Sequence, residues 1–248
     1  MNRIYSILLL VVVFGSCKKD WVDTKPNGSP SLANLWDGEA NVVKGTAALY
    51  ASMRQEPTWG RDLFYMQDAS DDLIVGRPKA DAENIKNFLC TGREGYLATG
   101  WGDLYTTLSI ANEAISGLQH ATNISDALKN RSLGEAYFVR GWVHFWLAYL
   151  WGHKNQGVPY DGIENAEYGK RIPPQLPSVT DNYALIASDM QKASELLPLF
   201  STYGSADQGR AHKAAALGYL VKTYAYWAQF DPSKWALIPD LCDRIKTE

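Results

Sequence analysis

Apolar residues recur every three or four positions along most of the chain, the spacing that places them on one face of an α-helix. One stripe covers residues 36–53 and ends before Pro57, where a helix is expected to stop. Further stripes cover residues 101–118 and 128–150. The first stripe consists of Trp36, Ala40, Val43, Ala47, Tyr50 and Met53. Each of these ranges is therefore predicted to be a helix.

The helical pattern continues in the C-terminal part of the chain. Residues 178–181 (Ser-Val-Thr-Asp) supply capping side chains and an acidic first turn for a helix that runs to Leu197. Residues 210–229 are predicted to form a helix rich in alanine and glycine, which lets two helix backbones approach closely. A last helix is expected around residues 235–245, where Pro239 either kinks the helix or delays its start.

Two stretches, residues 58–99 and 153–177, lack this periodicity and are predicted to be long irregular insertions. Four prolines exclude a continuous helix from the second stretch. Helices paired through short turns with alanine-rich faces are typical of tetratricopeptide-type stacking. The predicted fold is therefore mainly all-α, a tetratricopeptide-like α-solenoid of helical hairpins with long irregular loop insertions.

The first residues of the chain have the layout of a secretory signal. Arg3 precedes an apolar run over residues 7–14, which is about half the length of roughly 20 residues needed to span a bilayer. The run ends in Gly-Ser-Cys17, a sequence that suits a bacterial lipoprotein peptidase; an ordinary signal peptide with a coincidental cysteine is the alternative. We expect a lipoprotein signal peptide over residues 1–16, a lipidated tether over 17–34 and a helical domain over 35–248.

Composition narrows the function classes. The formal net charge is −3 and the sequence has no block of lysines or arginines, so a nucleic-acid partner is not expected. Nine tryptophans and fourteen tyrosines suggest a large aromatic core, with some rings free to stack on sugars.

Cys90 and Cys242 either pair or remain free thiols. The four histidines have no metal-ligand spacing, and no nucleotide or hydrolase motif occurs, so we predict no metal and no cofactor.

Five segments, in order, resemble the SusD/RagB family of outer-membrane nutrient-binding lipoproteins. They are Cys17–Pro26, Trp101–Tyr105 with Ala111-Asn112 after it, Gly134–Trp142, Asp189–Pro198 and Gly209–Ala216. The resemblance implies a tetratricopeptide-like scaffold in a non-enzymatic, surface-exposed lipoprotein of the outer membrane. It also implies that the protein binds oligosaccharides or peptides and delivers them to a SusC-type TonB-dependent transporter. Members of the family are longer, so the chain is expected to correspond to the N-terminal part of one. The alternative function is a lipid-anchored helical scaffold that docks envelope proteins without capturing a ligand.

The first insertion carries the candidate ligand-binding residues. They are Trp59, Tyr65, Asp68, Asp71, Asp72 and Arg77. The two aromatic rings are suited to stack on a pyranose, the acids to bind hydroxyl groups, and the arginine to donate two parallel hydrogen bonds. The alternatives are that the rings pin the insertion to the helices and that the acids stabilise turns. A glycosidase acid pair is the weakest interpretation, because adjacent acids on a strand point to opposite faces.

Charged and aromatic residues within the predicted helix over 128–150 have structural interpretations. Glu135 and Arg140 are expected to form structural ion pairs or interhelical hydrogen bonds that set the stacking register. Trp142, Trp146 and Trp151 are spaced as core residues.

Overall fold

The computed structural model describes residues 35–63, 83–85, 87–165, 168–169 and 173–247, and these residues are mainly helical. The long helices are α2 (Glu39–Met53), α5 (Gly95–Gln119), α6 (Asp126–Trp151), α7 (Val179–Leu196), α8 (Lys213–Trp227) and α9 (Ile238–Thr247). The short helical turns are η2 (Glu56–Gly60), η3 (Phe200–Thr202), η4 (Ser205–Asp207) and η5 (Pro232–Leu237). Within the described ranges, β-type pairing is limited to three isolated bridges.

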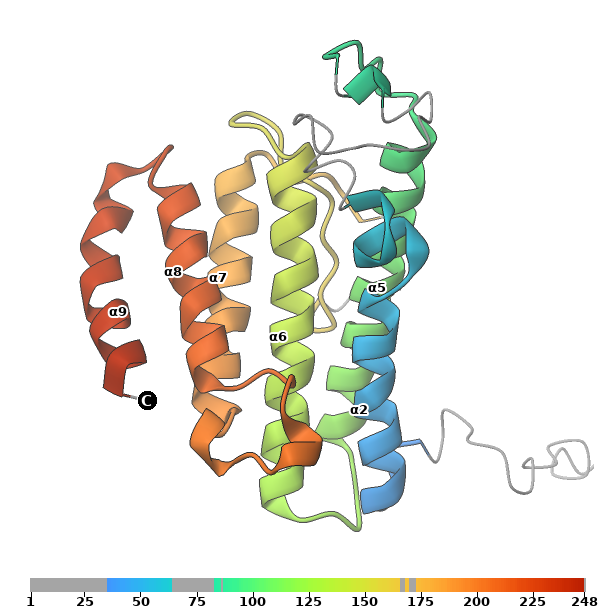
Figure 1. Cartoon of the computed structure of the whole chain (residues 1–248), viewed down its shortest axis with the longest axis vertical. Helices are drawn as coiled ribbons and strands as arrows, with labels where there is room; N and C mark the ends of the chain where they lie inside the picture. Colours follow the sequence, from blue (N-terminus) through green and yellow to red (C-terminus); the bar gives the residue numbers. More distant parts are fainter. Residues whose placement is uncertain (1–34, 64–82, 86, 166–167, 170–172, 248) are drawn as a thin grey trace, which may run out of the picture. The chain divides into compact units, whose positions relative to one another are not determined.

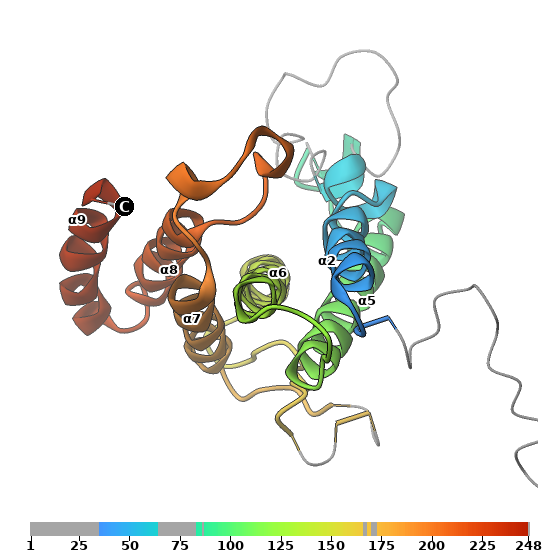
Figure 2. The ribbon, with the colours of Figure 1, turned by 90° about the horizontal axis from the view of Figure 1, so that it is seen from below.

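The helices stack side by side in chain order from α5 to α9, and α2 lies beside α5 (Figure 1). Seen along the helix axes, α6 lies between the α2–α5 pair and the α7–α8 pair (Figure 2). Successive long helices run in opposite directions and pack against one another, which is the arrangement of helical hairpins in a solenoid. The prediction of a mainly all-α, tetratricopeptide-like fold is confirmed.

Helix α6 supplies the centre of the core. Its residues from Gly134 to Ala148 are all buried, so this part of the helix is enclosed on every side, and its charged residues Glu135 and Arg140 have ion-pair partners. Gly141 lets α7 approach closely, because a Cβ atom there would lie 2.9 Å from the Met190 Cε atom. The predicted core positions Trp142 and Trp146 are buried, whereas Trp151 is half-buried.

The helix ends follow local sequence signals. Ser178 caps α7 by accepting a hydrogen bond from the Thr180 amide, and the Asp181 carboxylate accepts one from the Ser178 amide, so the predicted cap is confirmed. Helix α8 begins at Lys213 rather than at residue 210, because the His212 ring caps it by accepting from the Ala215 amide. Pro239 lies in the first turn of α9, where its missing amide hydrogen costs nothing, so it does not kink the helix.

The second insertion, residues 153–177, has no helix among its described residues and is held against the bundle by side chains. Tyr105 Oη donates to the Pro159 carbonyl at 2.6 Å, and Asn112 Nδ2 donates to the Asp161 carbonyl at 3.1 Å. Asn182 Oδ1 accepts from the Val158 amide at 2.9 Å. Helices α5 and α7 therefore fix this loop through satisfied backbone groups. In the first insertion η2 and the beginning of α5 are described, whereas residues 64–82 lie outside the described residues.

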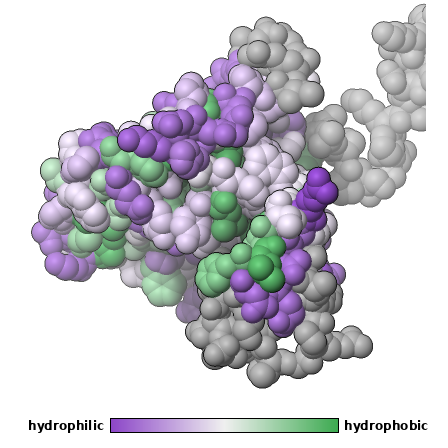
Figure 3. Space-filling model, turned by 90° about the horizontal axis from the view of Figure 1, so that it is seen from above, coloured by the Kyte–Doolittle hydropathy of each residue, from purple (hydrophilic) through white to green (hydrophobic). Residues whose placement is uncertain are grey.

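Hydrophilic and hydrophobic residues are mixed over the face of the molecule seen from above (Figure 3). Phe88 and Leu89 are the most exposed large apolar side chains of the described part, at 83% and 64%. Among the helices that the structure describes, none combines the length and apolar composition needed to cross a bilayer. Cys90 and Cys242 are free thiols, which answers the question that the sequence left open.

Candidate functional site

An aromatic cavity of about 480 Å³ lies between α2, η2, α6 and residues 208–210. Its lining residues are Ala47, Tyr50, Met53, Arg54, Trp59, Trp142, Gln208, Gly209 and Arg210. Three aromatic rings and the Met53 side chain make the wall largely apolar, and two arginines and one glutamine supply hydrogen-bond donors. A concave, mostly apolar site with a few polar groups is the usual form of a small-ligand site.

The turn η2 places Trp59 in this cavity. Thr58 is buried, and its hydroxyl donates to the Met53 and Gln55 carbonyls at 3.0 and 2.9 Å, which closes the chain tightly after α2. Gly60 continues the turn, where a Cβ atom would lie 2.8 Å from the Gln55 carbonyl oxygen. The sequence from Thr58 to Gly60 therefore turns the tryptophan back toward α6.

Trp59 packs its ring against two tryptophans of α6. The ring centroids lie 4.4 Å from Trp142 and 4.6 Å from Trp146, and Trp59 is half-buried. Contacts of this kind stabilise aromatic clusters beyond the area that they bury. Trp59 thus anchors the start of the first insertion on α6, as one of the two interpretations expected. It also lines the cavity, and its role toward a ligand stays a prediction.

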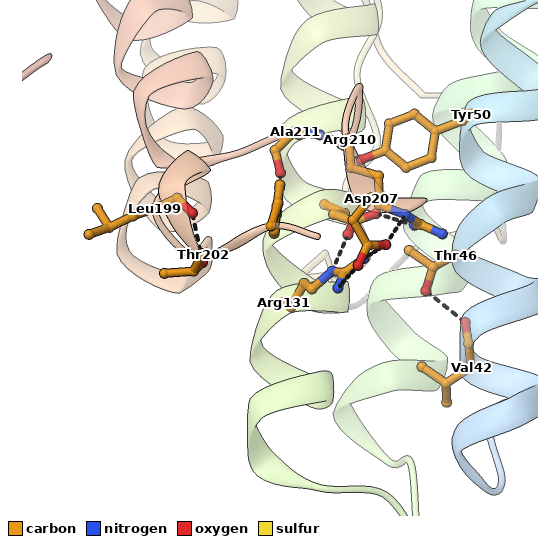
Figure 4. A network of polar contacts seen from close by, with 11 residues as sticks. Val42, Thr46, Tyr50, Arg131, Leu199, Thr202, Asp207, Arg210 and Ala211 are labelled. Atoms are coloured by element: carbon orange, nitrogen blue, oxygen red, sulfur yellow. Dashed lines mark hydrogen bonds and ion pairs between the residues drawn. The ribbon is translucent and has the colours of Figure 1, made fainter. Parts of the chain in front are cut away.

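A network of two arginines and two carboxylates fixes one wall of the cavity (Figure 4). The Glu135 carboxylate is fully buried and accepts from Arg131 Nε at 3.0 Å and from Arg210 Nη1 at 2.9 Å. Asp207 accepts from both terminal nitrogens of Arg131 and lies 3.1 Å from Arg210 Nε. The hydrogen bond from Arg131 lowers the pKa of Asp207, so this carboxylate is ionised at neutral pH. The network ties α6 to the segment before α8 and holds Arg210 in place.

Tyr50 connects the network to α2. The Arg210 guanidinium carbon lies 5.6 Å from the centroid of its ring, and its hydroxyl accepts from the Ala211 amide at 3.0 Å (Figure 4). Burial and the nearby Glu135 carboxylate raise the pKa of Tyr50, so the phenol remains neutral. Tyr50 therefore acts as a rigid, uncharged ring in the cavity wall.

Arg140 forms the second buried ionic cluster, on the other side of α6. It donates two hydrogen bonds to Asp189 of α7, at 2.8 and 2.7 Å, and one to Asn112 of α5 at 2.8 Å. Glu164 of the second insertion accepts at 2.9 Å. The expectation that Glu135 and Arg140 make structural ion pairs and interhelical hydrogen bonds is confirmed.

The remaining predicted site residues lie outside the described residues. These are Cys17, Tyr65, Asp68, Asp71, Asp72 and Arg77. Sequence reasoning missed Tyr50, Arg54 and Arg210 as cavity residues. Tyr50 looked like one more position of a buried helical stripe, and Arg210 belongs to the Gly-Arg-Ala segment already noted. No local signal indicated that α2 and the start of α8 meet.

The described lining residues of the cavity offer aromatic stacking surfaces and hydrogen-bond donors. No aspartate or glutamate is among its described lining residues, so the described part offers no facing carboxylate pair for glycoside hydrolysis. The described residues contain no group of histidine, cysteine and acidic side chains arranged to hold a metal ion. Flat rings beside guanidinium and amide donors match the apolar face and hydroxyl edge of a sugar.

Comparison with known proteins gives a consistent picture. A SusD-like family described as "Starch-binding associating with outer membrane" matches residues 20–225. A SusD-like protein of Bacteroides ovatus is 24% identical over 231 residues, and SusD-like protein P2 of Formosa agariphila is 26% identical over 229 residues. These matches cover 90% of this chain but 39% and 42% of the relatives, so the chain spans about 40% of their length.

Solved structures with the same fold include a SusD homologue from Bacteroides thetaiotaomicron, with a TM-score of 0.71, 20% identity, and coverage of 84% of this chain and 40% of that one. Surface glycan-binding protein A from Bacteroides fluxus has a TM-score of 0.67 at 23% identity, with coverage of 85% and 44%. At these identities the similarity establishes the fold. The family description names binding, in agreement with the expectation of a non-enzyme.

Proposed function

Because the chain belongs to the SusD-like family, whose description is starch-binding and association with the outer membrane, we propose that it binds oligosaccharides at the aromatic cavity. The observation that carries this proposal is the position of Trp59 and Tyr50 in the wall of a cavity that also presents Arg54, Gln208 and Arg210. A sugar ring would stack on an aromatic face while its hydroxyl groups accept from these donors. Peptide cargo would use the same donors but would not need the flat aromatic faces.

The proposal extends to the cellular setting. Lipidation of Cys17 would anchor the protein in the outer membrane with the helical domain at the cell surface, and residues 17–34 would serve as the tether. The bound oligosaccharide would pass to a SusC-type TonB-dependent transporter. The signal pattern at residues 1–17 and the family description support this placement.

A second candidate is a helical scaffold that docks envelope proteins without capturing a ligand. One observation favours it: Trp59 packs on Trp142 and Trp146, as expected of a residue whose task is to pin a loop.

Calorimetry of the full chain in detergent tests the proposal. The ligands are maltooligosaccharides and laminarin oligosaccharides, chosen because the family description names starch and one similar structure is a laminarin-binding protein. We expect measurable binding that Trp59→Ala weakens about tenfold, or about 1.4 kcal/mol. Trp59→Phe, which keeps a ring, is expected to retain most of the affinity.

Trp235→Ala is the matched control, because Trp235 is 55% exposed on η5 and does not line the cavity. Melting temperatures separate lost binding from lost folding. If the folded protein binds no oligosaccharide, the capture proposal is wrong, and copurification with a transporter then tests the scaffold alternative.

A further inference from the structure

The cations around the aromatic cavity suit an anionic sugar better than a neutral one. Two guanidinium groups, Arg54 and Arg210, line a space in which the described lining residues include no acid. A neutral sugar gains hydrogen bonds from such groups, whereas an anionic sugar also gains Coulomb attraction. Which of these cations is available to a ligand depends on the partners that each one already has.

Arg210 is compensated by its neighbours. It pairs with Glu135 at 2.9 Å and with Asp207 at 3.1 Å, and Arg131 completes a set of two cations and two anions. Its positive charge is therefore balanced within the protein. Arg210 is left to shape the wall and donate hydrogen bonds.

Arg54 is not compensated in this way. It follows directly after α2, its side chain is exposed, and it forms no ion pair with an acid of the described residues. The next acids along the chain, Glu56 and Asp62, both pair with Arg61 instead. A guanidinium group at the rim of an apolar cavity without a carboxylate partner is suited to bind an oxyanion in a two-point geometry.

Lys222 of α8 provides a second uncompensated cation at the same aromatic cluster. Its Nζ atom lies 4.7 Å from the Trp146 ring centroid and 5.0 Å from that of Phe145, and no acid of the described residues pairs with it. Trp146 in turn contacts Trp59, a lining residue of the cavity. Arg54 therefore lines the cavity together with Trp59 and Trp142, whereas Lys222 contacts the neighbouring Trp146 just outside the cavity lining.

We propose that this site selects anionic oligosaccharides, in which a sugar unit stacks on Trp59 while its carboxylate or sulfate group binds Arg54, with Lys222 favouring the next anionic unit. The inference rests on the proposed function, since it names the class of sugar for the same cavity. Its basis is charge complementarity: an aromatic surface bordered by cations that have no acidic partner in the described part of the chain attracts a ligand with an apolar ring face and an anionic edge.

Calorimetry of the full chain with oligogalacturonides and their methyl esters tests the carboxylate, because esterification removes the charge and keeps the sugar backbone. A sulfated galactan oligosaccharide and its desulfated form test the other oxyanion. For at least one charged form we expect a preference of about tenfold over its neutral partner, decreasing with added salt. Arg54→Gln and Lys222→Gln should each reduce that preference about three- to tenfold, because each lowers the affinity for the charged form more than the affinity for the neutral form.

Lys246→Gln is the matched control, because Lys246 is an exposed lysine of α9 that pairs with Asp243 away from the cavity. If both neutral forms bind as tightly as the charged ones, the anionic inference is overturned while the proposed function stands. A preference that survives both substitutions also overturns it, because the anion then binds elsewhere. If no oligosaccharide of any charge binds the folded protein, the proposed function fails as well.

Discussion

The residues around the buried His144 determine the protonation state of its imidazole ring. The Asn182 Oδ1 atom accepts from the Val158 amide, so its Nδ2 group must donate, and the acceptor is His144 Nε2 at 2.8 Å. The imidazole stacks on Tyr160 at 4.4 Å, and Nδ1 has no hydrogen-bond partner among the described residues. The ring is therefore held neutral, with its proton on Nδ1.

This burial predicts a pH dependence of stability. Burial, together with the positive charge of Arg140, lowers the pKa of His144 from 6.5 to about 3. The unfolded chain therefore binds the proton more tightly than the folded protein, and stability is complete above pH 6.5 and is lost as the pH falls toward 3. We expect this residue to contribute a loss of about 1.4 kcal/mol per pH unit between these values.

Urea unfolding at a series of pH values measures this slope. His144→Gln keeps an acceptor for Asn182 but cannot take up a proton, so the variant is expected to show a shallower slope between pH 6 and pH 4. His153→Gln is the control, because His153 is exposed. Equal slopes in the wild type and in His144→Gln would contradict the assignment of a neutral buried ring.

At the scale of elements, two helical glycines have opposite roles. In α5, a Cβ atom on Gly117 would lie 2.0 Å from the Trp36 Cδ1 atom, so the missing side chain leaves room for a large ring. In α8, a Cβ atom on Gly218 would meet nothing within 4 Å. The first glycine serves packing, whereas the second only adds backbone freedom to the unfolded chain.

Alanine substitution should therefore change stability in opposite directions. We expect Gly117→Ala to destabilise the protein by about 1–3 kcal/mol, because Trp36 must move. We expect Gly218→Ala to stabilise it by about 0.5–1 kcal/mol through helix propensity alone. Chemical denaturation of the two variants checks both signs, and a stabilised Gly117→Ala would show that Trp36 does not pack against α5 as described.

The predicted helices agree with the structure to different degrees. The start of α7 was predictable because its capping box lies within four consecutive residues. The start of α8 was predicted at residue 210, whereas the His212 ring caps the helix so that it begins at Lys213. The hydrogen bond from the Ala211 amide to Tyr50, which lies 161 residues earlier in the chain, had no local signal. The candidate site shows the same difference between local signals and contacts over long sequence distances. Trp59 was recognised as a candidate from its residue type and position, whereas its neighbours in the cavity come from α2, α6 and the segment before α8.

At the scale of the whole molecule, the proposed lipid anchor makes the cellular location testable. If Cys17 is acylated, Cys17→Ala should move the protein from the membrane fraction to the soluble fraction, because the acyl chains supply the membrane affinity. Cys90→Ala is the control, since Cys90 is an exposed free thiol of the domain and should not affect location. Fractionation and intact mass measure the outcome. A Cys17→Ala variant that stays fully membrane-bound would contradict the anchor.

The sequence by itself determined the helical segments and the family to which the chain belongs. Helix periodicity and caps act over three or four residues, so they can be read without knowing what lies nearby in space. Only the tertiary structure decided that Glu135 pairs with Arg210 and that Arg140 holds α5, α6 and α7 together. It also showed that Arg54, beside the cavity, has no acidic partner among the residues that the structure describes. The physical reason is that charge compensation and cavity shape depend on residues far apart in the chain, and helix packing alone brings these together.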